Sequence, residues 1–456
     1  MITLTLQQVA DVVGGQVVGP SAAGRMVTAG TIDSRTATPG SLFVALPGEH
    51  VDGHEFVADA LRRGAAGAIV REGTAVAEGI EVDDPGDALL GLGGWVRDEV
   101  DPAVVAVTGS SGKTTTKDLI RAALAGSRRV VANVGSYNNE LGVPLTCCEL
   151  ERDTEVLVAE VGARGVGHIS AMAQVLRPDV AVVTNVGAAH LEMFSDLAGV
   201  AKAKAELVEA LDTSGTAVLN ADDELVLAMA GRTGAQVVTY GTAAGADVRA
   251  TAVELDDRAR PSFDVDGVRV TVPLPGAHNV GNALAAIAAA RACGIGTAAA
   301  AEGLAAAAVS RWRMELVDAT GGVRVLNDAY NANPSSMAVA VRTLAAMAAE
   351  RRRWAVLGHM AELGAGGEQA HADIGRLCAE AGLDGLVVVG PKARSIHDGA
   401  AASGFAGILV FAETPEHAVT ELGQRLEPGD LVLVKASRSV GLERVAAALV
   451  TREDAA

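Results

Sequence analysis

Short runs of β-branched residues alternate with Ala- and Leu-rich stretches along almost the whole of this 456-residue chain. Such alternation is typical of parallel β-sheets whose strands are connected by helices packed on the faces of the sheet. Apolar residues make up 49% of the chain, which is enough for several buried cores. The pattern therefore predicts an α/β protein, and the length suggests about three domains at the usual ~150 residues each.

Three blocks of this pattern follow one another. The first, residues 1–98, holds strand candidates at 41–46 and 65–70 and a helix over 86–98, and it ends at a linker, EVDPA. The second, residues 99–310, holds a strand at 103–107, a glycine-rich loop, four further strands and an Ala-rich helix at 297–309. The third, residues 311–456, starts a new series, with strands expected at 323–326, 354–357, 385–389, 407–411 and 430–434. We expect an N-terminal α/β domain, a central parallel-sheet domain and a C-terminal Rossmann-like domain.

The charge and the composition argue against several classes of protein. The net charge is −19 and the longest basic tract is residues 351–353, so we expect no nucleic-acid binding. No apolar run reaches the ~18 residues that would span a membrane, so we expect no membrane insertion. The N-terminus does not read as a signal peptide and the four cysteines form no CxxC pair, which favours a cytoplasmic protein.

The stretch VTGSSGKTTTK, residues 107–117, directly follows the apolar run of the second block. Its backbone N–H groups can surround an anion, and the following helix would point its positive end at that anion. Lys113 would reach the outer phosphates, and Thr114 or Thr115 would place a hydroxyl on Mg²⁺. Val107 stands where the strict GxxxxGK[ST] pattern has its first glycine, so only the shorter TGxxGKT form fits. The predicted ATP-phosphate loop (P-loop) comprises Gly109, Ser110, Ser111, Gly112, Lys113, Thr114 and Thr115.

Two further candidates lie at the ends of strands in the same block. Glu160 ends the run EVLVAEVG, and His190 lies in the loop that follows DVAVVTNVGAAH. Because the carboxyl ends of parallel strands meet at one edge of a sheet, both side chains can approach the phosphate loop. Each is a plausible Mg²⁺ ligand.

Lysine is scarce in this chain. Of 37 basic residues only six are lysines, namely Lys113, Lys117, Lys202, Lys204, Lys392 and Lys435. Where positive charge alone suffices the sequence uses Arg, so each remaining Lys is a candidate for chemistry that needs an amine. The stretch GVAKAKAEL places two lysines after the metal candidates, where a cation is unexpected. Either this is a solvent-facing helix face with Glu206, or one of the two lysines is chemically altered.

Together these stretches resemble the Mur ligases, the ATP-dependent amide ligases of peptidoglycan synthesis. TGSSGKTTT is similar to the phosphate loop of the family, including the missing first glycine. Further stretches follow in family order over almost the whole chain: NNELGVPLT (138–146), TNVGAAHLEMF (184–194), GVAKAKAEL (199–207), NADD (220–223), PGAHNVGNALAA (275–286) and NDAYNANPSSM (327–337).

The resemblance implies the roles of the catalytic and metal-binding groups. Lys113 and Thr114 would hold the outer phosphates of ATP and a first Mg²⁺, together with Glu160. His190 would bind a second Mg²⁺ together with a carbamylated lysine, for which the spacing from His190 favours Lys204. A carbamate would replace the unexpected cation by an anion.

It also implies the groups that contact the nucleotide and the two substrates. Asn279 and Asn282 would contact adenine, and Arg313 and Asp328 would reach ATP from the third domain. The N-terminal domain would bind the UDP-sugar, with Ser34 and Arg35 near it. The residues expected near the incoming acceptor or the tetrahedral phosphate are Asn331, Lys435, Ser437 and Arg438.

Within the family, three stretches favour the ligase that joins D-alanyl-D-alanine to UDP-N-acetylmuramoyl-tripeptide through an acyl-phosphate. These are DSR…GSLFVALPGEHVDGHEF, NNELGVPLT, and NDAYNANPSSM followed by LGHMAELG. ATP and Mg²⁺ would be the cofactors, and we expect a monomer. A diamino-acid-adding ligase, whose usual DNPR-type motif is absent, and a folate polyglutamate ligase are the alternatives inside the family. A small-molecule kinase or ATPase and a non-catalytic partner protein are the alternatives outside it.

Overall fold

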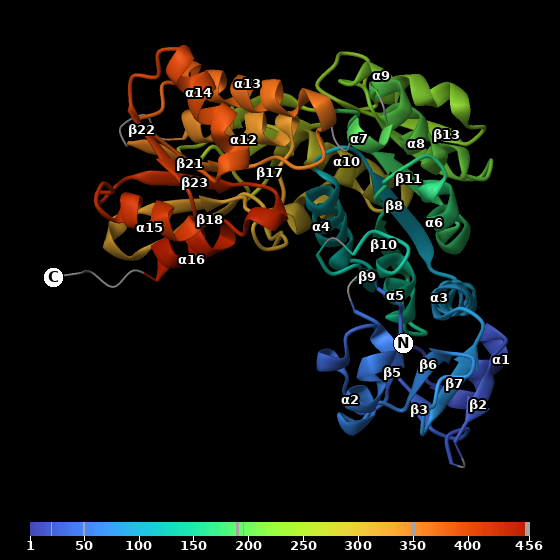
Figure 1. Ribbon diagram of the computed structural model, residues 1–456. Helices are drawn as coiled ribbons and strands as arrows, with labels where there is room; N and C mark the ends of the chain where they lie inside the picture. Colours follow the sequence, from blue (N-terminus) through green and yellow to red (C-terminus); the bar gives the residue numbers. More distant parts are fainter. Residues whose placement is uncertain are drawn as a thin grey trace.

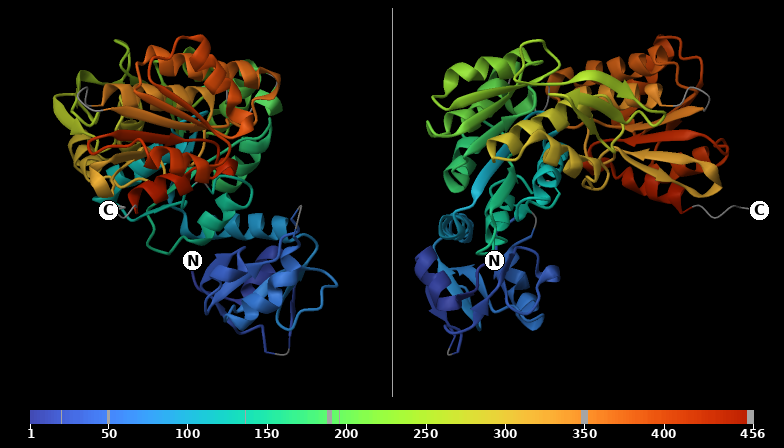
Figure 2. Two further views of the ribbon diagram at one scale, coloured as in Figure 1. Left: turned by 60° about the vertical axis from the view of Figure 1, so that its left-hand side comes forward. Right: turned by 180° about the vertical axis from the view of Figure 1, so that it is seen from behind.

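The computed structural model in Figure 1 describes residues 1–19, 21–48, 51–135, 137–187, 191–194, 196–347 and 352–451. Three main β-sheets follow one another along the chain, each with helices on its faces, which confirms the predicted α/β class. The sheet of the N-terminal block lies below the other two in both views of Figure 2. Within the described residues, none of the helices combines the length and apolar character that crossing a membrane requires.

The N-terminal block contains a five-stranded sheet in the order β2-β7-β6-β5-β4, parallel except for the β2–β7 pair. The predicted strands at 41–46 and 65–70 correspond to β5 and β6. The strands are β2 (Gln16–Val18), β4 (Ala29–Thr31), β5 (Ser41–Val44), β6 (Gly67–Arg71) and β7 (Gly79–Val82), and β1 (Leu4–Thr5) pairs with β3 (Met26–Val27). The helices are α1 (Leu6–Val13), α2 (Val57–Arg62) and α3 (Pro85–Val100).

Helix α3 connects the first block to the second. It begins at Pro85 behind an Asp84 cap, whose Oδ1 accepts the backbone N–H of Gly86 at 2.7 Å. It packs against α5 (Gly142–Cys148), and a Cβ at Gly93 would lie 2.7 Å from the Cα of Pro144. One continuous apolar core therefore runs from the N-terminal sheet into one face of the central sheet. Residue 98, the expected block boundary, lies inside the last turn of this helix.

The central block is built on a seven-stranded sheet in the order β14-β13-β12-β11-β8-β10-β9, with every neighbouring pair parallel. An antiparallel sheet of β15, β16 and β17 follows it. The strands are β8 (Ala103–Thr108), β9 (Val130–Ala132), β10 (Val156–Glu160), β11 (Val180–Val183), β12 (Thr216–Asn220), β13 (Gln236–Gly241), β14 (Val248–Arg249), β15 (Thr251–Leu255), β16 (Pro261–Val265) and β17 (Val268–Thr271). The expectation of four strands after β8 was wrong, because six further strands join this sheet and β15, β16 and β17 form the second one. Within the parallel sheet, β9 and β14, at three and two residues, are too short to show as apolar runs.

Helices cover both faces of the central sheet. Alternate residues of β8 point to opposite faces, so Val105 and Val107 join one core while Val104 and Ala106 join the other. Helices α4 and α10 pack on the first of these faces, and α6 and α8 on the second. The helices are α4 (Lys113–Ala125), α6 (His168–Leu176), α7 (Leu191–Phe194), α8 (Leu197–Glu209), α9 (Glu224–Leu227), α10 (Asn279–Ala292) and α11 (Thr297–Ala305).

Strand order explains where the phosphate loop opens. From β8 the chain first crosses to β9 and β10 on one side, and later to β11 on the other. In parallel sheets ligands bind in the crevice beyond the carboxyl ends of the strands where the order reverses. The loop after β8 lies at this position, and α4 follows it directly.

The third block has a six-stranded sheet in the order β18-β19-β23-β20-β21-β22, in which only β18 is antiparallel. All five predicted strands are present, and β18 is an additional one. The strands are β18 (Glu315–Asp318), β19 (Arg324–Asn327), β20 (Arg353–Gly358), β21 (Gly385–Val389), β22 (Ile408–Ala412) and β23 (Leu431–Lys435). The helices are α12 (Pro334–Ala346), α13 (Gly367–Glu380), α14 (Arg394–Ala402), α15 (Pro415–Gly423) and α16 (Glu443–Val450).

Candidate active site

A cavity of about 940 Å³ opens at the carboxyl edge of the central sheet, and all three blocks line it. The first block contributes Ile32. The central and third blocks contribute the charged groups that the later paragraphs describe, Lys113, Glu160, Lys204, Asp328 and Lys435. A cavity of this size suits a ligand at least as large as a nucleotide.

Two glycines give the phosphate loop its shape. Gly109 has φ 153° and a Cβ there would lie 1.8 Å from Thr184 Oγ1. Gly112 has φ 79° and a Cβ there would lie 2.6 Å from Asn282 Oδ1. Both positions thus combine a positive φ with a side-chain oxygen in the place of Cβ, so only glycine fits.

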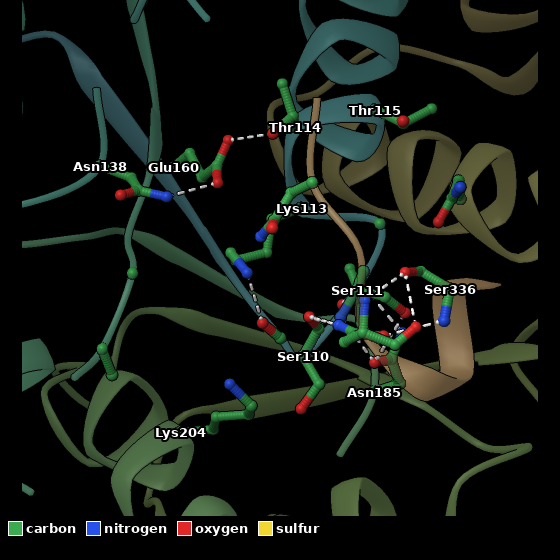
Figure 3. Close-up of a pocket in the computed structure, with 18 of the residues that line it drawn as sticks. Ser110, Ser111, Lys113, Thr114, Thr115, Asn138, Glu160, Asn185, Lys204 and Ser336 are labelled. Carbon is green, nitrogen blue, oxygen red and sulfur yellow. Dashed lines mark hydrogen bonds between the residues drawn. The ribbon is translucent and has the colours of Figure 1, made fainter. Parts of the chain in front are cut away.

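The next strand of the sheet anchors the two loop serines. Asn185 accepts the N–H of Ser111 through Oδ1 and donates from Nδ2 to its carbonyl, both at 3.0 Å, as Figure 3 shows. The carbonyl of Asn185 accepts the N–H of Ser110, also at 3.0 Å. The Ser110 hydroxyl donates to the carbonyl of Gly187 at 3.0 Å, and that of Ser111 donates to Asn185 Oδ1 at 3.2 Å. Both hydroxyls therefore hold the loop in shape, while both residues, which we expected in the ATP-phosphate loop, line the cavity.

The start of α4 is suited to an anion. Gly112 is its N-cap and has no side chain to bond the first N–H groups of the helix. Lys113 donates from Nζ to the carbonyl of Gly109 at 2.8 Å, and Thr115 also lines the cavity. Burial lowers the pKa of Lys113, Glu160 acts in the opposite direction and Arg313 lowers it further. An incoming phosphate would compensate this half-buried cation.

Thr114 and Glu160, the two residues predicted to hold Mg²⁺ together, are hydrogen-bonded to each other. The Thr114 hydroxyl donates to Glu160 Oε2 at 2.7 Å, and Asn138 donates to Oε1 of the same carboxylate at 2.7 Å (Figure 3). Arg313 donates from Nη2 to Thr114 Oγ1 at 3.1 Å. A hydroxyl and a carboxylate beside a phosphate loop are hard oxygen donors, which fit Mg²⁺. His190, the other predicted ligand, lies outside the described residues.

Lys204 lines the same cavity from α8 and is 6% exposed. Among the described residues, no hydrogen-bond or ion-pair partner reaches its ammonium group. Burial, with a smaller contribution from the charge of Lys113, lowers the pKa of Lys204 well below its ordinary value. Glu206, two residues further on, is also buried and accepts the backbone N–H of Gly167 at 2.6 Å and of Ser170 at 3.0 Å. The solvent-facing interpretation of this helix therefore holds for neither Lys204 nor Glu206.

The two asparagines expected to contact adenine are connected by hydrogen bonds at the start of α10. Asn279 is 1% exposed and donates to the carbonyl of Pro275 at 2.9 Å. Its Oδ1 accepts from Asn282 Nδ2 at 2.9 Å, and Asn282 Oδ1 accepts from Thr116 at 3.2 Å. Asn282 lines the cavity, as does the neighbouring His278, whose pKa burial lowers to about 4.

Asp328 and Lys435, on neighbouring strand ends of the third block, form a buried ion pair. Lys435 Nζ lies 2.6 Å from Asp328 Oδ2 and also donates to the carbonyl of Asn331 at 2.9 Å. Asp328 Oδ1 accepts the backbone N–H of Met314 at 3.1 Å. Burial lowers the pKa of Lys435, although Asp328 raises it. Asp328 therefore positions Lys435 and the segment next to Arg313.

The third block also contacts the phosphate loop directly. The guanidinium of Arg313 lies 4.2 Å from the centre of the Tyr330 ring, which supports it while it bonds Thr114. Asn333, the cap of α12, donates to the carbonyl of Ser110 at 3.4 Å. The exposed Asn331 lines the cavity between these groups.

Five predicted site residues do not line the cavity in the described structure. One is Asn279, which is buried at the start of α10. Ser34 is buried and donates to Asp59 at 3.4 Å, whereas Arg35 is exposed and pairs with Asp33 at 2.7 Å. Ile32, two residues earlier, is the residue of that stretch that lines the cavity.

The other two are Ser437 and Arg438. Ser437 connects two loops, because its hydroxyl accepts the N–H of Ala361 at 2.9 Å and donates to the carbonyl of Ala332 at 3.2 Å. Arg438 pairs with Glu443 at 2.8 Å and lies 4.5 Å from the centre of the Trp312 ring.

Sequence reasoning did not assign roles to Asn138 and Asn185, which hold Glu160 and the phosphate loop. Each lies inside a stretch that carried the family resemblance, NNELGVPLT and TNVGAAHLEMF. Their presence in these stretches could have marked them as site residues. The sequence alone, however, does not show which group an asparagine in a loop will bond.

Comparison with known proteins identifies the family of this chain. Residues 107–290 match the Mur ligase middle domain, residues 312–438 the Mur ligase glutamate ligase domain, and residues 27–92 the Mur ligase family catalytic domain. The chain is 41% identical to UDP-N-acetylmuramoyl-tripeptide--D-alanyl-D-alanine ligase from Mycobacterium tuberculosis, over 99% of this chain and 98% of the relative. The chain belongs to the Mur ligase family.

Solved structures agree with this membership. MurF from Acinetobacter baumannii superposes with a TM-score of 0.87 at 32% identity, over 98% of this chain and 99% of that one. MurF ligase from Thermotoga maritima, solved in complex with ADP, superposes with a TM-score of 0.80 at 28% identity, over 92% and 96%. This Mur ligase thus shares the whole three-sheet arrangement with both.

Proposed function

We propose that this Mur ligase uses ATP to join D-alanyl-D-alanine to UDP-N-acetylmuramoyl-tripeptide, giving the UDP-linked pentapeptide precursor of peptidoglycan. The observation that carries the proposal is the 41% identity, over almost the full length of both chains, to a ligase named for this reaction. The cavity supports it, because one space is lined by a phosphate loop, hard oxygen donors and cationic groups from two blocks.

The proposed chemistry activates a carboxylate, which by itself is a poor acylating agent because oxide is a poor leaving group. The terminal carboxylate of the tripeptide attacks the γ-phosphorus of ATP, ADP leaves, and an acyl-phosphate forms. The amine of D-alanyl-D-alanine then attacks the acyl carbon, and the tetrahedral species breaks down to the amide, phosphate and a proton. The protein must hold two anions together and keep water away from the acyl-phosphate.

The central block would hold the nucleotide phosphates. Lys113 and the first N–H groups of α4 face the negative charge of the outer phosphates, and Asn282 lies where the loop meets α10. Thr114 and Glu160 would hold Mg²⁺, with His190 as the ligand implied by the resemblance. When bound, Mg²⁺ offsets the negative charge on the phosphates and the attacking carboxylate.

Lys204 is the residue that we propose to be carbamylated. Its burial and lowered pKa favour the neutral amine, which is the form that reacts with CO₂. The amine nitrogen bonds to carbon, one proton leaves, and a buried cation becomes an anion with two oxygen acceptors. That anion would face the metal-binding edge, where an ammonium would repel Mg²⁺.

The third block would complete the site. Arg313 reaches Thr114, and Asn333 reaches Ser110, so the groups that meet the γ-phosphate belong to two blocks. We propose that this arrangement closes over the reactants and that Lys435, held by Asp328, faces the transferred phosphoryl group or the acceptor. Asn331 would lie beside the acceptor.

We further propose that the enzyme acts as a monomer in the cytoplasm. Apart from His190, which lies outside the described residues, the groups assigned to the reaction line one cavity of a single chain. ATP and a UDP-linked substrate are both water-soluble, so the proposal requires no membrane contact.

The test is phosphate release from ATP with UDP-N-acetylmuramoyl-tripeptide and a series of acceptors. We expect release and amide formation with D-alanyl-D-alanine, and little with single D-alanine, a diamino acid or glutamate. Release that does not need both peptide substrates would indicate a kinase or an ATPase instead. Faster amide formation from diaminopimelate and a UDP-linked dipeptide would indicate the diamino-acid-adding ligase.

A further inference from the structure

Lys117 is a buried lysine that the proposed reaction does not use. It lies on α4, one helical turn after Lys113, and is 2% exposed. Its Nζ donates to the carbonyls of Asn133 at 2.6 Å and Gly135 at 3.2 Å, and lies 2.9 Å from Asp118 Oδ1. An ammonium group has three N–H donors, so each has an acceptor. The planar fork of an arginine could not reach the same three positions, which explains a lysine in this Arg-rich chain.

The carboxylate partner of Lys117 is itself fixed in place. Asp118 is 4% exposed, and its second oxygen, Oδ2, accepts the backbone N–H of Ser310 at 2.8 Å. Ser310 lies just before the segment that carries Arg313. The ammonium of Lys117 is therefore held on one side by its own helix and on the other by the segment of residues 133–135.

That segment leads to the predicted metal carboxylate. The side chain of Asn133 accepts the backbone N–H of Glu160 through Oδ1 at 2.9 Å and donates from Nδ2 to the carbonyl of Tyr137 at 3.2 Å. The next residue, Asn138, donates to Glu160 Oε1 at 2.7 Å. Lys117 thus holds the backbone of Asn133, and the side chain of Asn133 holds the main chain of Glu160. Asn133 also bonds Tyr137, the neighbour of Asn138, which in turn bonds the carboxylate of Glu160.

The chain of contacts closes on α4. Glu160 Oε2 accepts from Thr114, which lies on the first turn of the helix that carries Lys117 on its second turn. We infer that Lys117 is a positioning residue for the nucleotide-bound metal: it holds residues 133–135, and through Asn133 it places Glu160 so that Glu160 and Thr114 present their oxygens to one ion. This inference rests on the proposed function, in which Thr114 and Glu160 hold Mg²⁺.

The buried Lys117–Asp118 ion pair could instead only stabilise the fold, so the test must measure metal binding directly. The experiment measures the affinity of the full chain for ADP by calorimetry, once with Mg²⁺ and once with EDTA. We expect Lys117→Met to weaken ADP binding with Mg²⁺ by about 10- to 100-fold, the usual effect of removing an outer partner of a metal ligand. Binding with EDTA should not change, because the phosphate loop and Lys113 remain. The control is Lys202→Met, which removes an exposed lysine of α8 and should change neither affinity.

Two further variants keep the inference falsifiable if Lys117→Met folds poorly. Asn133→Ala leaves the backbone acceptor of Lys117 in place and cuts the next link, so it should cause the same selective loss of Mg²⁺-dependent affinity. In a Glu160→Ala background, Lys117→Met should cause no further loss, because the two act through one ligand. Equal losses with and without Mg²⁺, or additive losses in the double variant, would overturn the inference. If the wild-type chain binds ADP equally with and without Mg²⁺, the proposed metal site falls as well.

Discussion

Lys204 and Lys202 lie two residues apart on α8, yet Lys204 is 6% exposed inside the cavity and Lys202 faces solvent. In a helix, residues two apart point about 200° away from each other, so the two lysines cannot share an environment. Lys204 is thus the lysine that can act at the metal-binding edge.

We expect Lys204→Ala to lose most ligase activity, and added formate or acetate to restore part of it by occupying the place of the carbamate. Lys204→Arg keeps the charge but cannot form the carbamate, so it should be inactive and not rescued. Lys202→Ala should be nearly normal. The measurement is turnover of the four proteins with and without the small carboxylate. A fully active Lys204→Ala, or an inactive Lys202→Ala, would contradict the assignment.

A Cβ at Gly112 should strongly weaken nucleotide binding. Gly112→Ala would place a methyl group 2.6 Å from Asn282 Oδ1 at φ 79°, so the loop, Asn282 or both must move. Gly126→Ala, at the other end of α4, meets nothing within 4 Å and is the matched control. Calorimetric titration with ADP and Mg²⁺ should show at least a tenfold loss for the first variant only. Equal affinities would show that the loop tolerates a side chain.

Breaking the Asp328–Lys435 pair should impair the use of ATP without weakening the binding of the UDP-substrate. Asp328→Ala leaves the ammonium of Lys435 buried and releases the N–H of Met314, so ATP use should fall strongly. Breaking a buried pair from one side also destabilises a protein by about 3–5 kcal/mol. Affinity for the UDP-linked tripeptide should change little, because we assign that site to the first block.

The matched control for this variant is Asp373→Ala, which breaks a surface pair with Arg376. Such a change alters the free energy of unfolding by only about 0–1 kcal/mol. Denaturant unfolding measures both stability changes, and calorimetry measures both affinities. Equal loss of the ATP and UDP-substrate affinities in Asp328→Ala would count against the assignment of the two sites to different blocks.

His278 should make the protein less stable in mild acid. Burial lowers its pKa in the folded state to about 4, while the unfolded chain keeps the ordinary value near 6.5. Between these values the unfolded state binds the extra proton, so stability is full above pH 6.5 and falls as pH decreases towards 4. His278→Gln should flatten this dependence, whereas His417→Gln, at an exposed histidine, should not. The midpoint of urea unfolding at pH 7 and at pH 5 gives the comparison.

The sequence predicted the parts of the site that depend on short spacing or on the rules of parallel sheets. Lys113 and Thr114 follow the loop glycines directly, and Glu160 was placed at the cavity because it ends a parallel strand. The hydrogen bonds of Asn138 to Glu160 and of Asn185 to the loop could not be predicted, because each joins loops that are distant in sequence.

Resemblance alone could not decide how individual polar side chains are used. Arg35 and Arg438 both find a carboxylate close by in sequence, Asp33 and Glu443, and these local pairs hold them away from the cavity. Among the strands, β18 was missed because four residues at the antiparallel edge of a sheet show no apolar run to mark them.

The packing of α3 against α5 has a consequence for how the molecule melts. The N-terminal sheet and one face of the central sheet share a single apolar core, so exposing one exposes the surface that covers the other. Two separate cores, formed almost entirely by third-block residues, stabilise the third sheet. Heating should therefore unfold the first two sheets in one cooperative transition and the third in another. Because we propose that nucleotide binds groups of the central and third blocks, it should bring the two transitions together.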